Sequence, residues 1–375
     1  MIPRCRFTVA GILLLASWAA APLGAEEPQS LRAFYFGNSL TGATNPAWHA
    51  ELGRSAGKQW EAEWWLGAGW QLWQHREELE AGRDLFGGGS KGDLTIEPEL
   101  VQSAPYNAKK FYGGTWDAIV LQLFGAYLTK ETDQMWSRKL SRRKDVGDLQ
   151  AAADLIQLSL KRNPECRIFV YQVWAPMPAG KVPPQDQLPA WAQGKEKLRT
   201  AEFPAREGFD YAKAWLQPYD KATEKPWQGE YGPVNRTRDF SYQVFEGLKE
   251  RYPELWTQGR LRMIPAGDLY LELDRAAREG RVPGVRDIRD FYTDVQHIRF
   301  GLARYTAAAL FYASLFREHP GKLDWRIYGD REKYGDDPHH DGGELLPITA
   351  ENAAAVNDIL WGVLDRHPYA GFGGK

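Results

Sequence analysis

Short apolar runs alternate along this chain with longer segments of helical periodicity, and this alternation limits the possible folds more than any other feature. Residues 117–122 are nearly all apolar, which is typical of a strand buried on both faces of a parallel sheet. Strands alternating with helices predict an α/β fold with a central parallel sheet covered on both faces. Ligands of such sheets bind beyond the carboxyl ends of the strands. The predicted strands lie at 33–36, 60–65, 117–122, 167–173 and 261–265, and the predicted helices at 46–57, 71–81, 146–162, 240–252, 298–316 and 350–364.

The first 25 residues have the pattern of a secretory signal peptide. Arg4 and Arg6 form a positive segment, an apolar run of about 14 residues follows, and Ala25 supplies a small residue at the expected cleavage site. A spanning helix needs about 20 apolar residues, so a membrane anchor is the weaker interpretation. We therefore expect a secreted or periplasmic protein with no membrane span in its mature chain.

Cleavage after Ala25 has two consequences for the mature chain. It removes Cys5 and leaves Cys166, so no disulfide can form within the chain, and Cys166 is expected to be an inert buried thiol. The formal net charge moves from −2 to −4, which argues against a general nucleic-acid binder. Residues 26–375 are long enough for a single domain with a substantial core. Residues 176–235, rich in Pro and Trp, are too long for an ordinary connection and predict an insertion or lid.

The first candidate for chemistry is Ser39, which follows a predicted strand in the sequence Gly37-Asn38-Ser39-Leu40-Thr41. Gly37 permits a tight turn, and a hydroxyl at the carboxyl end of a strand can face a ligand. A serine between a strand and a helix is more often a helix cap than a nucleophile, so this segment alone is a weak signal.

The second candidate is the pair Asp294 and His297, placed before the predicted helix at 298–316. A histidine acting as a base needs a carboxylate to select its tautomer and stabilise its cation. A spacing of three residues around a helix start can bring the two side chains together. The alternative is that Asp294 caps the helix and His297 lies on its surface.

Taken together, these segments resemble the SGNH/GDSL hydrolase superfamily, in which Gly-Asp-Ser-Leu carries the nucleophile and Asp-x-x-His supplies acid and base. Asn38 stands at the position of the usual Asp. The resemblance spans about residues 31–316 and implies a three-layer α/β/α sandwich with a flavodoxin-like parallel sheet. It also implies a catalytic triad of Ser39, His297 and Asp294, with no metal and no organic cofactor.

The resemblance also implies donors for an oxyanion hole, namely the backbone N–H groups of Ser39 and of a glycine in the family's second block. Gly67-Ala68-Gly69-Trp70 is the best match for that block, and we choose Gly69 over Gly67. The family's third block normally supplies an Asn side chain, but here the strand ends in Gln122. This departure is similar to a divergent branch of the family, and the Gln122 amide is the predicted third donor. Trp70 and His75 are predicted to contact the substrate, with a helix-surface histidine as the alternative for His75.

Other features give weaker indications. The chain has 16 Trp where about four would be average. For any single Trp a place in the core is the expected role, but for the group near the second block contact with a saccharide and a core role both stay open. A cluster at 336–341 has ligand types for a metal but lacks helix-face spacing, so no metal site is predicted. Asn235-Arg236-Thr237 matches a glycosylation sequon.

These observations favour a secreted serine esterase that cleaves O-acyl groups, with a small-molecule or glycan ester as its substrate. An acyltransferase using the same triad is one alternative. A glycan-binding protein on an inactive hydrolase scaffold is another, and the missing third-block Asn is its best support. Fold alone does not decide among them.

Overall fold

The computed structural model describes residues 28–67, 69–80, 108–125, 128, 147–180, 205–220, 229–330 and 345–372. The predicted signal peptide and the cluster at 336–341 lie outside these residues, as does much of the predicted insertion. Within the described residues, no helix is long and apolar enough to cross a membrane.

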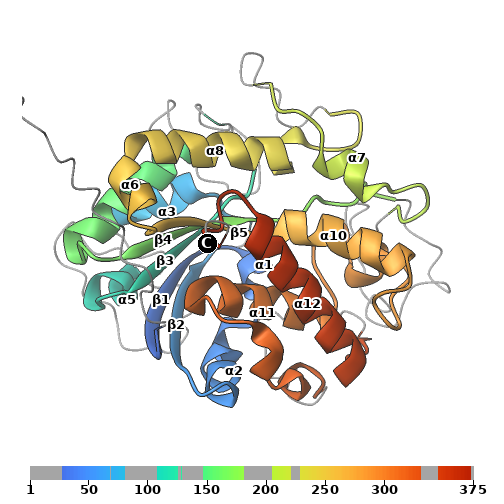
Figure 1. Cartoon of the computed structure of the whole chain (residues 1–375). Coiled ribbons are helices and arrows are strands. Elements are labelled where there is room, and N and C mark those ends of the chain that lie inside the picture. The colour runs from blue at the N-terminus through green and yellow to red at the C-terminus, as the bar shows by residue number, and fades with distance from the viewer. Residues whose placement is uncertain are drawn as a thin grey trace, which may run out of the picture.

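A five-stranded parallel sheet forms the centre of the fold, with the strand order β2-β1-β3-β4-β5 (Figure 1). This is the order of flavodoxin-like doubly wound sheets, whose ligands bind where the strand order reverses. The register sets Phe36 of β1 beside Leu121 of β3, so the carboxyl ends of these two strands are level. The strands are β1 (Ser30–Gly37), β2 (Gln59–Leu66), β3 (Ala118–Gln122), β4 (Arg167–Gln172) and β5 (Leu261–Pro265).

Helices cover both faces of the sheet, so the molecule is a three-layer α/β/α sandwich (Figure 1). Successive side chains of β1 point to opposite faces, and Tyr35 joins one buried apolar cluster while Phe34 and Phe36 join the other. The first cluster includes residues of α1 (Ser39–Gly42), α2 (His49–Ser55), α7 (Tyr211–Trp215), α10 (Ala266–Arg278), α11 (Leu302–Phe316) and α12 (Ala350–Arg366). The second includes residues of α3 (Leu72–Glu80), α5 (Ala108–Gly113), α6 (Asp148–Arg162), α8 (Arg238–Arg251) and α9 (Pro253–Thr257).

Several short elements complete the described fold. A second, two-stranded sheet pairs β6 (Phe300–Gly301) with β7 (Leu345–Leu346) in parallel. Short 3₁₀ turns lie at Pro46–Trp48, Val234–Arg236, Ile288–Phe291, Pro320–Lys322 and Trp325–Tyr328.

The five predicted strands are confirmed to within a few residues, as are the predicted helices other than 298–316. Thr349 is the N-cap of α12 and forms a capping box with Asn352. The amphipathic helix α10 was missed. The helix predicted at 298–316 begins only at Leu302, because residues 300–301 pair with β7 and Gly301 has a φ of 78°.

The described part of the predicted insertion contributes to the core. Tyr211 and Trp215 of α7 are fully buried, and their polar atoms bond to the start of α10 through Gly267 O and Asp268 Oδ1. This part therefore packs as a layer helix and does not form a lid.

Candidate active site

Ser39 lies directly beyond β1 and is the first residue of α1. The Asn38 side chain caps this short helix by accepting a hydrogen bond from Leu40 N–H at 3.0 Å. A Cβ atom at Gly37 would lie 2.9 Å from Thr41 Cβ and 2.7 Å from Gln122 Oε1, so the packing of these two side chains against the turn favours glycine. The segment therefore places the Ser39 hydroxyl at the carboxyl edge of the sheet, as the sequence predicted.

Asp294 and His297 lie in a tight turn between Tyr292 and Ile298, which form an antiparallel bridge. Asp294 Oδ1 accepts hydrogen bonds from the backbone N–H groups of Gln296 and His297, both at 2.7 Å. The expectation that this pair flanks a helix start is wrong, since α11 begins five residues after His297. The local carboxylate-to-backbone bonds close the turn without a helix.

The turn brings His297 against Ser39, 258 residues away in sequence. His297 Nε2 lies 2.8 Å from Ser39 Oγ, and His297 Nδ1 lies 2.7 Å from Asp294 Oδ2. Both distances are those of hydrogen bonds in which a carboxylate orients an imidazole and the imidazole contacts a hydroxyl. Burial alone would raise the pKa of Asp294, but the His297 imidazole and the two backbone N–H groups outweigh burial and hold this pKa below 3.8.

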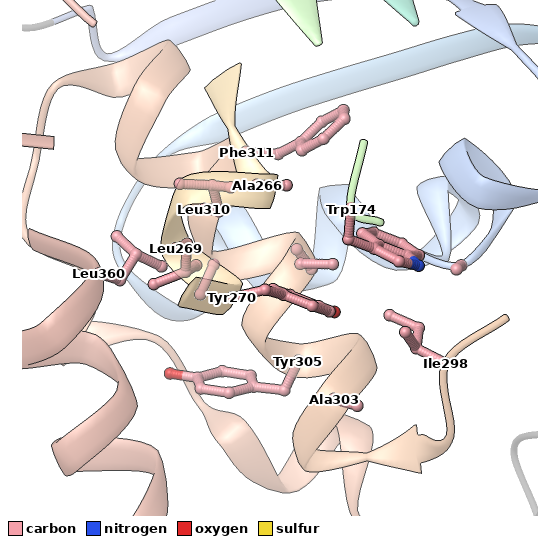
Figure 2. Close-up of a cluster of buried hydrophobic side chains, with 14 of the residues drawn as sticks. Trp174, Ala266, Leu269, Tyr270, Ile298, Ala303, Tyr305, Leu310, Phe311 and Leu360 are labelled. Carbon is pink, nitrogen blue, oxygen red and sulfur yellow. The ribbon is translucent and has the colours of Figure 1, made fainter. Parts of the chain in front are cut away.

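Residues that follow β4 hold this turn against the sheet. Trp174 Nε1 donates a hydrogen bond to Gln296 O at 2.7 Å, and Met177 N–H donates to Val295 O at 2.7 Å. The Trp174 ring is parallel to that of Tyr270, with an interplanar angle of 8° and ring centroids 5.0 Å apart (Figure 2). The triad thus depends on a buried aromatic stack that sequence spacing did not reveal.

The predicted second block lies beside the nucleophile turn. Gly67 N–H donates to Gly37 O at 3.1 Å, and Asn38 Nδ2 donates to Trp70 O at 2.9 Å. Gly69 lies between these two anchors with a φ of 68°, a conformation that favours glycine. Ser39 N–H belongs to the first turn of α1 and so has no acceptor within the helix. This arrangement is consistent with the predicted backbone donors of Ser39 and Gly69.

Gln122 has structural contacts that its predicted role as an oxyanion donor did not include. Its Oε1 accepts hydrogen bonds from Asn38 N–H, Thr41 N–H and the Thr41 hydroxyl, at 3.0, 3.0 and 2.5 Å. Its Nε2 donates to Asn38 Oδ1 at 2.7 Å, and the side chain is 1% exposed. The two backbone N–H groups require Oε1 on their side, so the orientation of the amide is determined. Gln122 therefore holds the turn that carries Ser39. These bonds use Oε1 and one of the two N–H groups of Nε2, and the role of Gln122 as an oxyanion donor stays a prediction.

The prediction that His75 lines the substrate site is also wrong. The ring is fully buried, and Nε2 lies 2.9 Å from Gly37 O. Edge contacts with Phe36, Trp65 and Trp70 enclose it. Burial lowers its pKa to about 3, so the ring is neutral and Nε2 donates to the carbonyl. His75 therefore supports the end of β1 through its bond to Gly37 O. Its burial also excludes the alternative of a histidine on a helix surface. Trp70 is only partly buried and stays at the edge of the site.

Most of the described tryptophans near the site belong to the core, which is one of the two roles that the sequence left open. Their burial follows from their place in the strands and layer helices, where a large apolar ring fills the space between layers. Five of those that the sequence analysis associated with the site are at most 4% exposed, namely Trp60, Trp65, Trp73, Trp174 and Trp215. Trp191 and Trp227 lie outside the described residues.

Two further sequence features have structural outcomes. Cys166 is 1% exposed, and burial raises the pKa of its thiol to about 12, which is consistent with an inert residue. Asn235 of the sequon is also 1% exposed, and its Nδ2 donates to Gly125 O at 2.6 Å, so the amide is not accessible for glycosylation.

No sequence motif indicates a role at the site for Arg236, which contacts the turn that holds Asp294 and His297. Its Nη2 donates to Gln296 Oε1 at 3.0 Å, and the guanidinium lies 4.0 Å from the centre of the Phe124 ring. The only available signal was its position in the sequon, which says nothing of burial.

No family model and no curated protein match this chain. A crystal structure of a DUF4886 family protein from Bacteroides uniformis is similar at a TM-score of 0.47 and 14% identity, covering 90% of this chain and 95% of that protein. A protein named provisionally as a platelet activating factor from Streptococcus pneumoniae is similar at a TM-score of 0.33 and 12% identity, covering 78% and 86%.

Proposed function

We propose that this chain is a serine hydrolase of the SGNH type that cleaves carboxylic O-acyl esters. The observation that carries the proposal is the continuous hydrogen-bonded path from Ser39 Oγ through His297 to Asp294 Oδ2. Its position at the carboxyl edge of the sheet, beside the order reversal between β1 and β3, is where such folds bind ligands. The hydroxyl, base and orienting carboxylate are the three parts that acyl transfer through a serine requires.

In the proposed reaction, Ser39 Oγ attacks the ester carbonyl carbon while His297 Nε2 accepts the hydroxyl proton. Asp294 holds the proton on Nδ1, so that Nε2 is free to act as the base. The backbone N–H groups of Ser39 and Gly69 stabilise the oxyanion, and His297 then returns the proton to the departing alcohol oxygen. A water molecule next gives a proton to His297 and attacks the acyl-serine, which releases the carboxylic acid and restores Ser39. The residues need no metal or organic cofactor for these steps.

The proposal also covers the compartment in which the enzyme acts and the alcohol part of its ester substrate. The signal-like residues 1–25 support a secreted or periplasmic enzyme. Burial of most described tryptophans weakens the case for a glycan, and the partly buried Trp70 is its remaining support.

Hydrolysis of 4-nitrophenyl acetate, butyrate and octanoate by residues 26–375 tests the proposal, together with labelling by an active-site serine phosphonate. We expect short acyl chains to react fastest and Ser39→Ala to abolish both hydrolysis and labelling. Ser314→Ala is the matched control, because Ser314 is 4% exposed in α11 and has no role in the site. Equal activity in the wild type and Ser39→Ala would remove Ser39 as nucleophile. Inactivity without labelling would favour a binding protein.

A further inference from the structure

Arg236 is a buried cation to which none of the described carboxylates is bound. Its side chain is 7% exposed, and its Nε is buried with no hydrogen-bond partner among the described residues. Nη2 bonds to the neutral Gln296 amide, and in the part of the chain that the structure describes no ion pair reaches the guanidinium. Desolvation lowers its pKa to about 10, which still leaves it charged at neutral pH.

Arg76 is an example of a buried guanidinium that is paired with a carboxylate. It is 1% exposed, and its Nε forms an ion pair of 2.6 Å with Asp154. Desolvating a charge costs several kcal/mol, and a carboxylate that accepts two N–H groups is the usual compensation. Among the described residues, Arg236 instead has the Phe124 ring and one amide oxygen as its partners. Its donors thus remain available for an anion.

The position of Arg236 relates this unused charge to the triad. It stacks on Phe124, two residues beyond the end of β3, and β3 is the neighbour of β1, which carries Ser39. Its amide partner Gln296 directly precedes His297. Arg236 therefore lies at the same edge of the sheet as the candidate nucleophile.

We propose that Arg236 binds a carboxylate of the substrate, so that the preferred substrates are esters that carry a separate carboxylate. This inference rests on the proposed function. The planar guanidinium matches a carboxylate geometrically. Asp294 contributes a negative charge close enough to act on Arg236, so a singly charged carboxylate fits the local balance better than a dianionic phosphate. The carboxylate can belong to the acyl group, as in a half-ester of a dicarboxylic acid, or to the alcohol, as in an acetylated uronic acid.

Matched ester pairs distinguish these two sources. For the acyl side, 4-nitrophenyl hydrogen adipate is compared with 4-nitrophenyl hexanoate; for the alcohol side, acetylated methyl glucuronoside is compared with acetylated methyl glucoside. We expect the wild type to prefer the charged member of one pair by about 10- to 100-fold in kcat/KM, as charge-assisted hydrogen bonds would give. A wild type with no preference for either charged ester overturns the inference, and this outcome needs no variant.

Arg236→Met should reduce the charged-to-neutral ratio to near one, and Arg236→Lys should give an intermediate ratio, because lysine keeps the charge without the planar fork. The control is Arg167→Met. Arg167 is a partly buried arginine at the amino end of β4, with a carbonyl as its hydrogen-bond partner, so the ratio should not change. An unchanged ratio in folded Arg236→Met overturns the inference.

If the wild type is inactive and Ser39 is not labelled by the phosphonate, the proposed function itself has failed. In that case calorimetric titration of the wild type with adipate and with glucuronate tests the anion site alone. Saturable binding that Arg236→Met abolishes and Arg167→Met retains supports the site. If neither anion binds, the inference is wrong.

Discussion

Replacing Gln122 by Met should destabilise the protein strongly, because the Gln122 amide is the partner of buried groups in the turn that carries Ser39. Methionine fills a similar volume but offers no comparable acceptor. The substitution leaves Asn38 N–H and Thr41 N–H without their acceptor. Each buried donor left unpaired costs about 1–3 kcal/mol, so we expect a loss of about 2–6 kcal/mol in the free energy of unfolding. Asn38 Oδ1 keeps Leu40 N–H as a donor and adds little to the loss.

Gln172→Met is a matched control at the end of the neighbouring strand. Gln172 is fully buried, but its Oε1 accepts a single hydrogen bond, from Asp268 N–H at 3.3 Å, and its Nε2 has no partner among the described residues. Its replacement leaves Asp268 N–H without a weak hydrogen bond and removes an Nε2 group that has no partner among the described residues. We therefore expect a loss of about 0–2 kcal/mol in the free energy of unfolding.

Urea unfolding followed by tryptophan fluorescence measures both variants against the wild type. If Gln122→Met loses no more stability than Gln172→Met, the positioning role assigned to the amide is refuted. An oxyanion donor would behave differently. Its loss would lower kcat by about 100- to 1000-fold at unchanged stability, whereas loss of the positioning bonds should lower stability and kcat together.

The remaining predictions concern charge and reactivity. Asp294→Asn should lower kcat by about 10³- to 10⁴-fold in the ester assay. The Oδ1 atom of the new amide would keep the bonds from the turn's backbone N–H groups, so Nδ2 would face His297 Nδ1 and force the imidazole proton onto Nε2. Wild-type activity in this variant would contradict the triad. Burial lowers the pKa of His49 and His75 to about 3, below the ordinary 6.5, so the unfolded chain binds more protons between these values and stability should fall as pH falls from 6.5 toward 3. Each contributes up to about 1.4 kcal/mol per pH unit, and His75→Gln should flatten the slope of unfolding free energy against pH by about one proton; an unchanged slope would contradict the buried neutral ring. Cys166 should react with iodoacetamide only after unfolding, as measured by mass spectrometry, and rapid labelling of the native protein would contradict its burial.

The sheet could be predicted from sequence because its inner strands are short runs of mostly apolar residues, as expected for strands buried on both faces. The segment 118–122 is an example, with all five residues buried. Helix α10 was missed although ten of its thirteen residues are buried, because charged Asp, Glu and Arg residues are interspersed with its apolar side chains. Local patterns also misplaced the start of α11, since the extended conformation at 300–301 depends on pairing with β7.

At the candidate site, the sequence determined the residue types and their order along the chain: Ser39 after β1, and Asp294 and His297 three residues apart near the carboxyl end. Which side chains meet depends on the tertiary structure. It brings His297 to 2.8 Å from Ser39, bonds the Gln122 amide to the nucleophile turn and encloses His75 in aromatic rings. The reason is that hydrogen-bond partners and burial depend on contacts between residues far apart in sequence. A local motif can therefore name a donor or a base, but the packing of the strands and layers sets what that group touches.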